Sequence, residues 1–279
     1  EKLEEYGLVA TMGIITVKMN DTGKLTWKEA EDMVATGRWG VANHTKNHDQ
    51  TGFSSLTEAQ LKEEINGGQE ILRQHFPSLP IVSMYPPGGI TSTLIKKVVN
   101  EKHHILRGTS GGNNTLPLTE SAMLALKCNG VGQFANATID NDKMKGWIDS
   151  GITDGKLIVE MWHGIGDSDG SSWGGNCPED VAETHLEYVA QKMNDGKLWV
   201  ATLDDVATYT IQKLNAKARV LEETENKVVL SLTDDLDDSI YKSELTINFP
   251  MPNGYTKATA TMGGKDIKAT VADGKVSVT

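Results

Sequence analysis

The sequence has little cysteine and no long apolar run. Its 279 residues include 2 cysteines, Cys128 and Cys177. Two cysteines are too few for a disulfide framework, although one bridge between them is possible. No run approaches the ~18 apolar residues of a membrane span. We therefore expect no membrane insertion, and the cysteines say little about the compartment.

The chain is also short of positive charge. Its net charge is -11 and its pI is about 5.1. Such a surface repels nucleic acid and anionic lipid, so we expect no nucleic-acid partner and favour a neutral or cationic one, such as a polysaccharide. The start, Glu1–Glu5, is charged and has no apolar core behind it, as in a mature secreted protein from which a signal peptide is gone.

Residues 6–216 alternate short apolar runs with helical patterns, which predicts a parallel sheet or barrel. Thr26 with Glu29, and Thr57 with Gln60, have the spacing of helix capping boxes. We expect about seven strands, one short of a closed (β/α) barrel. The predicted strands are Tyr6–Val17, Trp39–Asn43, Pro80–Met84, His104–Arg107, Leu124–Cys128, Leu157–Trp162 and Leu198–Thr202. The predicted helices are Thr26–Thr36, Thr57–Gln74, Thr91–Asn100, Asp142–Ser150 with Gly151 as its stop, Glu179–Met193 and Asp204–Asn215.

Residues 217–279 have a different pattern. Short alternating segments are separated by Asn253-Gly254, Gly263-Gly264 and Asp273-Gly274. This pattern predicts a small antiparallel β module, of the β-sandwich kind, as an accessory to the first domain. We therefore divide the chain into a domain at 1–216 and a module at 217–279.

Three unusual segments follow predicted strands. They are His44–His48, Tyr85–Gly89 and His163-Gly164. In barrels of parallel strands, active sites gather at the carboxyl ends of the strands. We therefore expect these three segments to lie on one face.

His44 and His48 are four residues apart. On one helical turn both imidazoles would point the same way and could bind one metal ion. Neutral imidazole suits zinc, cobalt, nickel or iron. The alternative is a pair of hydrogen-bonded histidines that hold a loop, and the spacing by itself leaves both open.

His163 follows the predicted strand Leu157–Trp162. It is either a structural side chain or a general acid, since histidine titrates near neutral pH. Trp162 and Trp173 could stack on sugar rings. Their alternative role is core packing, which we favour for Trp162 more than for Trp173.

These segments, in this order, resemble the polysaccharide deacetylase family, also called carbohydrate esterase family four. Gly7-Leu8-Val9-Ala10-Thr11-Met12 resembles the family's G-x-x-A-T-F-F, and Asn43–His48 resembles its N-H-[ST]-x-x-H. Tyr85-Pro86-Pro87-Gly88 resembles the third motif and Met161-Trp162-His163-Gly164 the last. The resemblance covers about residues 6–212.

The resemblance implies a deformed (β/α) barrel and the hydrolytic removal of acetyl groups from sugars. It implies that His44 and His48 bind a divalent metal ion, most often zinc, with cobalt or nickel as alternatives, and that His163 is the general acid. A backbone N–H near Tyr85 would help to hold the oxyanion. By the same resemblance, Tyr85, Pro86, Gly88, Trp162 and Trp173 would contact the substrate.

The sequence departs from the family in two places. The opening motif T-F-D-D, which supplies the base and the third metal ligand, is absent, and we expect the natural protein to be longer and to carry that first strand. Asp49 is a substitute ligand only by proximity. Tyr85 stands where the third motif usually has arginine, and Asp140 or Asp142 would correspond to the aspartate that tunes the acid histidine.

Two rival functions remain. Gly166–Gly170 reads G-x-S-x-G, with Ser168 as a possible nucleophile, but a loop follows it where a nucleophile elbow needs a helix. A non-catalytic carbohydrate-binding protein on a degenerate deacetylase scaffold is the other. We favour an extracellular or periplasmic deacetylase, with acetylated xylan as substrate ahead of N-acetylglucosamine polymers (chitin or peptidoglycan).

Overall fold

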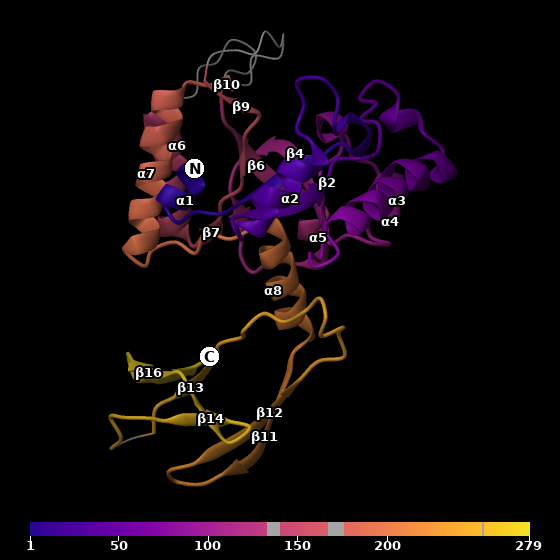
Figure 1. Cartoon of the computed structure of the whole chain (residues 1–279). Helices are drawn as coiled ribbons and strands as arrows, with labels where there is room; N and C mark the ends of the chain where they lie inside the picture. The colour runs from indigo at the N-terminus through magenta and orange to yellow at the C-terminus, as the bar shows by residue number, and fades with distance from the viewer. Residues whose placement is uncertain (133–139, 167–175, 253) are drawn as a thin grey trace. The chain divides into compact units, whose positions relative to one another are not determined.

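The structure is a computed structural model of the whole chain, and it describes residues 1–132, 140–166, 176–252 and 254–279 (Figure 1). Contacts between residues divide the chain into two compact units, Glu1–Ala207 and Thr208–Thr279. The division falls inside helix α8 (Leu203–Asn215), whereas the boundary predicted from the sequence lies at the end of that helix. The predicted domain limits stay a prediction.

The first unit is built on a six-stranded parallel sheet with the strand order β1-β2-β3-β4-β6-β8. Its register pairs Ala10 with Trp39 and Ile14 with Asn43, so the first two strands end together. This sheet confirms the predicted α/β barrel-type fold. Its strands are β1 (Ala10–Ile14), β2 (Trp39–Asn43), β3 (Ser83–Met84), β4 (Ile105–Gly111), β6 (Leu126–Gly130) and β8 (Glu160–Met161).

Helices connect these strands, and α2 and α3 pack against β2 (Figure 1). Both capping boxes form as predicted, with Thr26 and Glu29 at the start of α2 and Thr57 and Gln60 at the start of α3. The helices of this unit are α1 (Lys2–Glu5), α2 (Trp27–Ala35), α3 (Glu58–His75), α4 (Thr93–Val99), α5 (Glu120–Met123), α6 (Asn141–Asp154) and α7 (Glu179–Asn194). Short strands also occur at β5 (Asn114–Thr115), β7 (Lys156–Leu157), β9 (Gly164–Ile165) and β10 (Asn176–Cys177).

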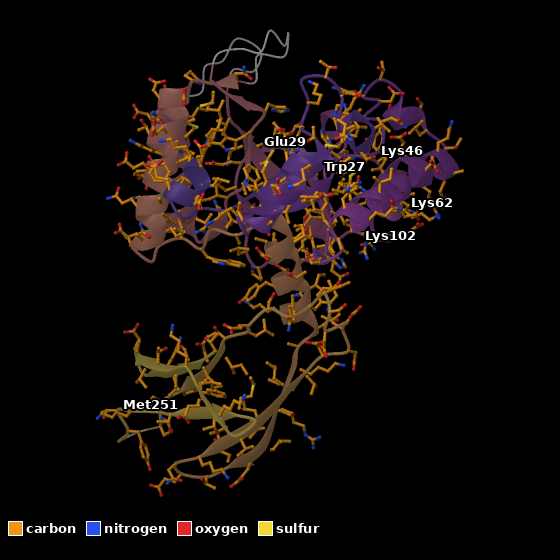
Figure 2. All side chains as sticks on the ribbon, viewed as in Figure 1. Trp27, Glu29, Lys46, Lys62, Lys102 and Met251 are labelled. Atoms are coloured by element: carbon orange, nitrogen blue, oxygen red, sulfur yellow. The ribbon has the colours of Figure 1, made fainter. Side chains whose placement is uncertain are left out.

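Apolar clusters join the helices of this unit to the sheet. One contains Phe53, Leu61, Ile65 and Leu106, and it packs α3 and α4 onto the strands. On α2, Trp27 stacks on His75 of α3 with ring centroids 3.7 Å apart, and Trp27 and Glu29 can be found in Figure 2. Both cysteines are buried and free, so the bridge that the sequence allowed is absent.

Three predicted elements need correction. Leu198–Thr202 forms no strand, because Thr202 instead caps α8 by accepting a hydrogen bond from the Asp205 N–H at 3.2 Å. The predicted strand Leu157–Trp162 is split into β7 and β8. Helix α6 continues past Gly151 to Asp154, and Gly155 follows it in the left-handed conformation that glycine favours.

The second unit contains short antiparallel strands, as the alternating pattern predicted. A hairpin joins β11 (Lys217–Glu223) to β12 (Val228–Thr233), and β13 (Ile247–Pro250) pairs with β17 (Lys275–Val278), which also pairs with β16 (Ala269–Ala272). A further hairpin joins β14 (Ala260–Met262) to β15 (Lys265–Ile267). Among the described residues, no helix is long and apolar enough to cross a membrane.

Candidate active site

The two histidines predicted to bind metal lie in the loop that follows β2. Their ring centroids are 4.5 Å apart and the rings are inclined by 77°. The loop is not the helical turn that we expected. Thr45 and His48 have φ angles of 66° and 59°, so two left-handed residues fold the chain back and bring the side chains together.

Neighbouring backbone holds this loop in place. The Lys46 N–H donates to the Glu64 carbonyl of α3 at 2.9 Å, and the Thr45 N–H donates to Asn43 Oδ1 at 2.9 Å. Asn43 is fully buried and donates in turn to the Ile65 carbonyl at 2.7 Å. Gly68 permits this approach, since a Cβ there would lie 3.0 Å from Asn43 Oδ1 and 3.2 Å from the Lys46 nitrogen.

A single hydrogen bond determines the tautomer of His44. Its Nδ1 lies 2.6 Å from the Tyr85 carbonyl oxygen, which can only accept, so Nδ1 carries the proton and Nε2 carries the lone pair. Burial lowers the pKa of His44 to about 4, and burial also lowers the pKa of His48. Both imidazoles are therefore neutral near pH 7, the form that binds metal.

Tyr85 turns its side chain into the interior of the sheet. The ring is 8% exposed, and a Cβ on Gly13 of β1 would lie 2.6 Å from it. Its N–H donates to the Asn43 carbonyl at 2.8 Å, so this N–H is not free to hold an oxyanion. Pro86 is buried, while Gly88 is exposed with a φ angle of 60°. Substrate contacts by Tyr85, Pro86 and Gly88 stay a prediction.

Arg107 is a site residue that the sequence did not reveal. It lies on β4 and is 8% exposed, with its guanidinium 4.2 Å from the centre of the Tyr85 ring. Its positive charge contributes to the lowered pKa values of His44 and His163, after burial, which is the largest cause for both. The sequence predicted a strand at residues 104–107, but that prediction does not say which side chains of the strand face the histidines.

His163 lies two residues beyond the end of β8 and is exposed. Desolvation lowers its pKa, and the charges of Arg107 and His48 lower it further, which places His163 in the same electrostatic neighbourhood as the loop histidines. Two of the three predicted segments, His44–His48 and His163-Gly164, are therefore brought together through their histidine side chains. The third, Tyr85–Gly89, joins them through the Tyr85 carbonyl, which accepts from His44.

A buried network adjoins His163. Glu160 of β8 accepts hydrogen bonds from His185 Nε2 at 2.8 Å and from the Trp162 indole at 3.2 Å. His185, on α7, is fully buried. Trp162 also packs against the cluster that contains Val131, Met144 and Cys177, in agreement with the packing role that we favoured for it.

A third metal ligand is not present among the described residues, where no three His, Cys, Asp or Glu side chains gather. Asp49 instead closes its own turn, accepting from the Thr51 and Gly52 N–H groups at 3.1 and 3.0 Å. Asp140 caps α6 by accepting from the Lys143 N–H at 3.0 Å, and Asp142 lies in the first turn of that helix. Trp173 and Ser168 lie outside the described residues.

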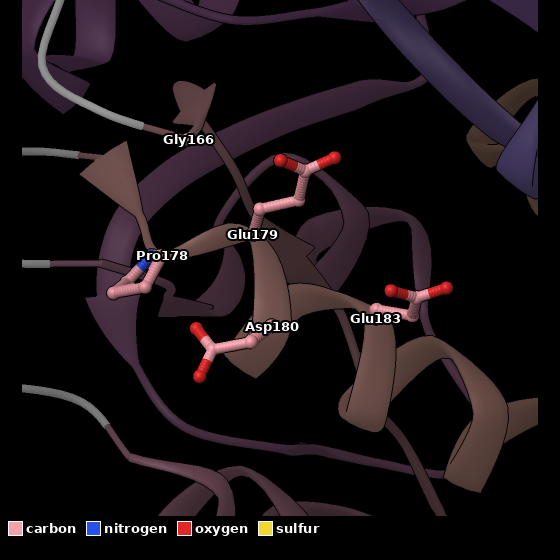
Figure 3. A pocket seen from close by; sticks show the side chains of 5 residues that line it. All are labelled: Gly166, Pro178, Glu179, Asp180 and Glu183. Carbon is pink, nitrogen blue, oxygen red and sulfur yellow. The ribbon is translucent and has the colours of Figure 1, made fainter.

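A separate pocket of about 470 Å³ opens at the start of α7 (Figure 3). Gly166, Pro178, Glu179, Asp180 and Glu183 line it, and none of the predicted site residues does. Lys2 forms an ion pair with Glu183. This acidic pocket is therefore not the site that the motifs predict.

Residues 1–105 match the family model of polysaccharide deacetylases. The matched region contains β1, the His44–His48 loop and the Tyr85–Gly89 segment. Over these residues the family model agrees with the resemblance identified from the motifs.

Similar proteins include a gellan lyase from Bacillus sp., which is 24% identical over 305 aligned positions. That alignment takes in 98% of this chain, and the chain spans 11% of the length of the gellan lyase.

Solved structures are similar as well. The Xyl-CE4 domain of a multidomain xylanase from the hindgut metagenome of Trinervitermes trinervoides is 12% identical, covers 76% of this chain and 81% of its own, and has a TM-score of 0.45. The family 4 carbohydrate esterase from Streptomyces lividans is 16% identical, with coverages of 71% and 80% and a TM-score of 0.41. The peptidoglycan deacetylase PdaC from Bacillus subtilis is 13% identical, with coverages of 76% and 83% and a TM-score of 0.42.

Proposed function

We propose that this chain is a metal-dependent deacetylase that hydrolyses acetyl groups on a polysaccharide. The observation that carries the proposal is the pairing of His44 and His48, with rings 4.5 Å apart and the His44 Nδ1 proton directed to the Tyr85 carbonyl. Proteins usually orient a metal-binding imidazole by a hydrogen bond from its other ring nitrogen, and a backbone carbonyl is one common acceptor.

The residues fit one half of a metal site. His44 offers Nε2, and His48 lies beside it with a neutral ring. Zinc is the first choice and cobalt or nickel the next, because imidazole suits all three. When bound, such an ion would polarise the acetyl carbonyl and lower the pKa of a bound water.

His163 is the residue that we assign to proton transfer. Its pKa is lowered by desolvation, so the ring is neutral near pH 7 and can accept a proton from the attacking water. As the tetrahedral intermediate breaks down, the same nitrogen returns the proton to the departing oxygen or nitrogen of the sugar. The products are acetate and the free sugar hydroxyl or amine.

The proposed substrate class rests on the similar proteins and on the net charge of the chain. We propose acetylated xylan ahead of N-acetylglucosamine polymers, in an extracellular or periplasmic setting. The similar proteins bear names that refer to xylanase, peptidoglycan deacetylase and gellan lyase, so all three polymers belong in a test. The net charge of -11 is compatible with neutral or partly deacetylated, cationic chains.

The test is acetate release from acetylated xylan, chitin oligomers, peptidoglycan and acetylated gellan, with zinc and with a chelator. We expect release from at least one polymer that depends on zinc, and a loss of about 100-fold or more in His163→Gln, the scale of general acid–base catalysis. The control is His75→Gln, which alters a histidine on α3 that pairs with Glu31 at 2.8 Å. Release that persists in His163→Gln would refute the assignment, and its loss in Ser168→Ala with metal still bound would favour the serine mechanism.

One observation favours a second candidate, a carbohydrate-binding protein without catalysis. The described residues supply two imidazoles to the site but no carboxylate. Tight binding of one of these polymers, with no acetate released under any metal condition, would establish that candidate.

A further inference from the structure

Glu64 of α3 holds the loop that carries His44 and His48. Its backbone carbonyl accepts from the Lys46 N–H at 2.9 Å. Its carboxylate accepts from the Asn47 N–H at 3.0 Å and also from the Asn47 side-chain amide. A single residue of the helix therefore receives the backbone N–H groups of both residues that directly precede His48.

Glu64 uses its carboxylate differently from other acidic residues of α3. Glu58 pairs with Lys97 at 2.9 Å, and Glu63 pairs with the Lys46 side chain. Ion pairs of this kind at the surface contribute little, because solvent screens them. The Glu64 side chain is half-buried and accepts from a backbone N–H. A hydrogen bond to a charged acceptor is stronger than one between neutral groups, so this contact can hold a backbone segment in place.

The loop requires such contacts because two of its residues adopt a rare backbone conformation. The φ angles of Thr45 and His48 are 66° and 59°, a left-handed region that persists only where the surroundings enforce it. The His48 N–H donates to Thr45 Oγ1 at 3.0 Å, a bond that closes the loop on itself. The bonds from Asn47 to Glu64 instead tie the peptide that leads into His48 to the helix.

We propose that Glu64 is a positioning residue that acts through Asn47 to keep the His48 ring beside the His44 ring. The ring centroids are 4.5 Å apart in the held loop. The role of the rings as metal ligands rests on the proposed function, but their separation can be measured without a metal ion. Without the carboxylate, Asn47 would bond to water, and His48 could return to a more common backbone conformation. The rings would separate and bind a shared ion more weakly.

The experiment compares the full chain with substitutions on either side of this contact. Glu64→Ala removes the carboxylate, and Glu64→Gln keeps one acceptor oxygen without the charge. Glu63→Ala is the matched control, because Glu63 is the adjacent residue of the same helix and contacts the same loop, but through the Lys46 side chain. Asn47→Ala is made alone and together with Glu64→Ala. Alanine favours a helix, so α3 should form in every α3 variant, and thermal unfolding is recorded for all of them.

Two quantities are measured for each variant. The first is the nuclear Overhauser effect between the His44 and His48 rings in the metal-free chain with labelled histidines, assigned with His44→Ala and His48→Ala. The second is the dissociation constant for zinc.

We expect the ring-to-ring effect in the unaltered chain and in Glu63→Ala. Glu64→Ala should lose it and bind zinc about tenfold more weakly, as for other groups that orient metal ligands. Glu64→Gln should retain part of both properties. Asn47→Ala should add no further loss to Glu64→Ala, because the two substitutions remove the same contact.

The proposal would be overturned by an unchanged ring-to-ring effect and zinc affinity in Glu64→Ala, by an equal loss in Glu63→Ala, or by the absence of the effect in the unaltered chain. Acetate release that continues alongside any of these results would leave the proposed function intact. Conversely, an unaltered chain that shows the ring-to-ring effect but binds no zinc would refute the metal-dependent function. Loss of the effect in Glu64→Ala would then still establish Glu64 as the residue that positions His48.

Discussion

Asp204 should make the stability of the first unit fall as the pH rises. The side chain is 2% exposed, and Oδ1 accepts from Ser83 Oγ at 2.5 Å and from the Val82 N–H at 3.1 Å. Burial raises its pKa from the ordinary 3.8 to about 7, against the opposing effect of these hydrogen bonds. The folded chain thus retains a proton that the unfolded chain releases.

The sign and the size follow from this difference in pKa. Between pH 4 and pH 7 the folded state binds more protons than the unfolded state, so the free energy of unfolding declines as the pH rises. The contribution is fully present below pH 3.8 and has been lost above pH 7. At about 1.4 kcal/mol per pKa unit, the change between pH 5 and pH 8 is about 2 to 3 kcal/mol.

The assay is urea unfolding at pH 5, 6, 7 and 8 for the unaltered chain and for Asp204→Asn. The variant should lose about 2 to 3 kcal/mol of the pH dependence, because its amide does not titrate. Asp21→Asn is the control, since this aspartate also belongs to the first unit but its side chain is exposed. Identical pH profiles for the unaltered chain and Asp204→Asn would refute the reasoning.

Two further substitutions test how the site is held. Gly68→Ala should lower stability by about 1 to 3 kcal/mol and weaken zinc binding, because its Cβ would press on Asn43 Oδ1 and the Lys46 nitrogen. Gly67→Ala, whose Cβ would meet only side-chain atoms at 3.5 Å or more, is its control, and an equal response of both in urea unfolding and zinc titration would contradict this account. His185→Leu should cost about 1 to 3 kcal/mol in urea unfolding, because the Glu160 carboxylate loses a hydrogen-bond partner, and unchanged stability would show that the network has no such role.

The sequence predicted the elements of the first unit well where local chemistry determines them. The capping boxes at Thr26 and Thr57 start α2 and α3 as expected, because their hydrogen bonds join residues three apart. The run Trp39–Asn43 became β2 with the same limits. The end of α6 was harder to predict from the sequence. Gly151 lies within the helix and Gly155 ends it, and the two glycines differ only in backbone conformation.

The site was predicted in its residues but not in its geometry. The spacing of His44 and His48 suggested a helical turn, whereas the left-handed conformations of Thr45 and His48 depend on Asn43 and on the proximity of α3. Arg107 could not be identified, because its role comes from Tyr85, which is distant in sequence. Contacts of this kind arise from tertiary packing, which periodicity and spacing do not describe.

The central claim is that His44 and His48 together bind a divalent metal ion. The most direct measurement is the zinc content of the purified chain after dialysis against a zinc buffer, compared with His44→Ala, His48→Ala and the control His75→Gln. We predict about one zinc ion per chain for the unaltered protein and the control, and a loss of binding by about tenfold or more in each of the other two variants. Zinc content that is unchanged in both alanine variants, or no zinc bound by the unaltered chain, would contradict the claim.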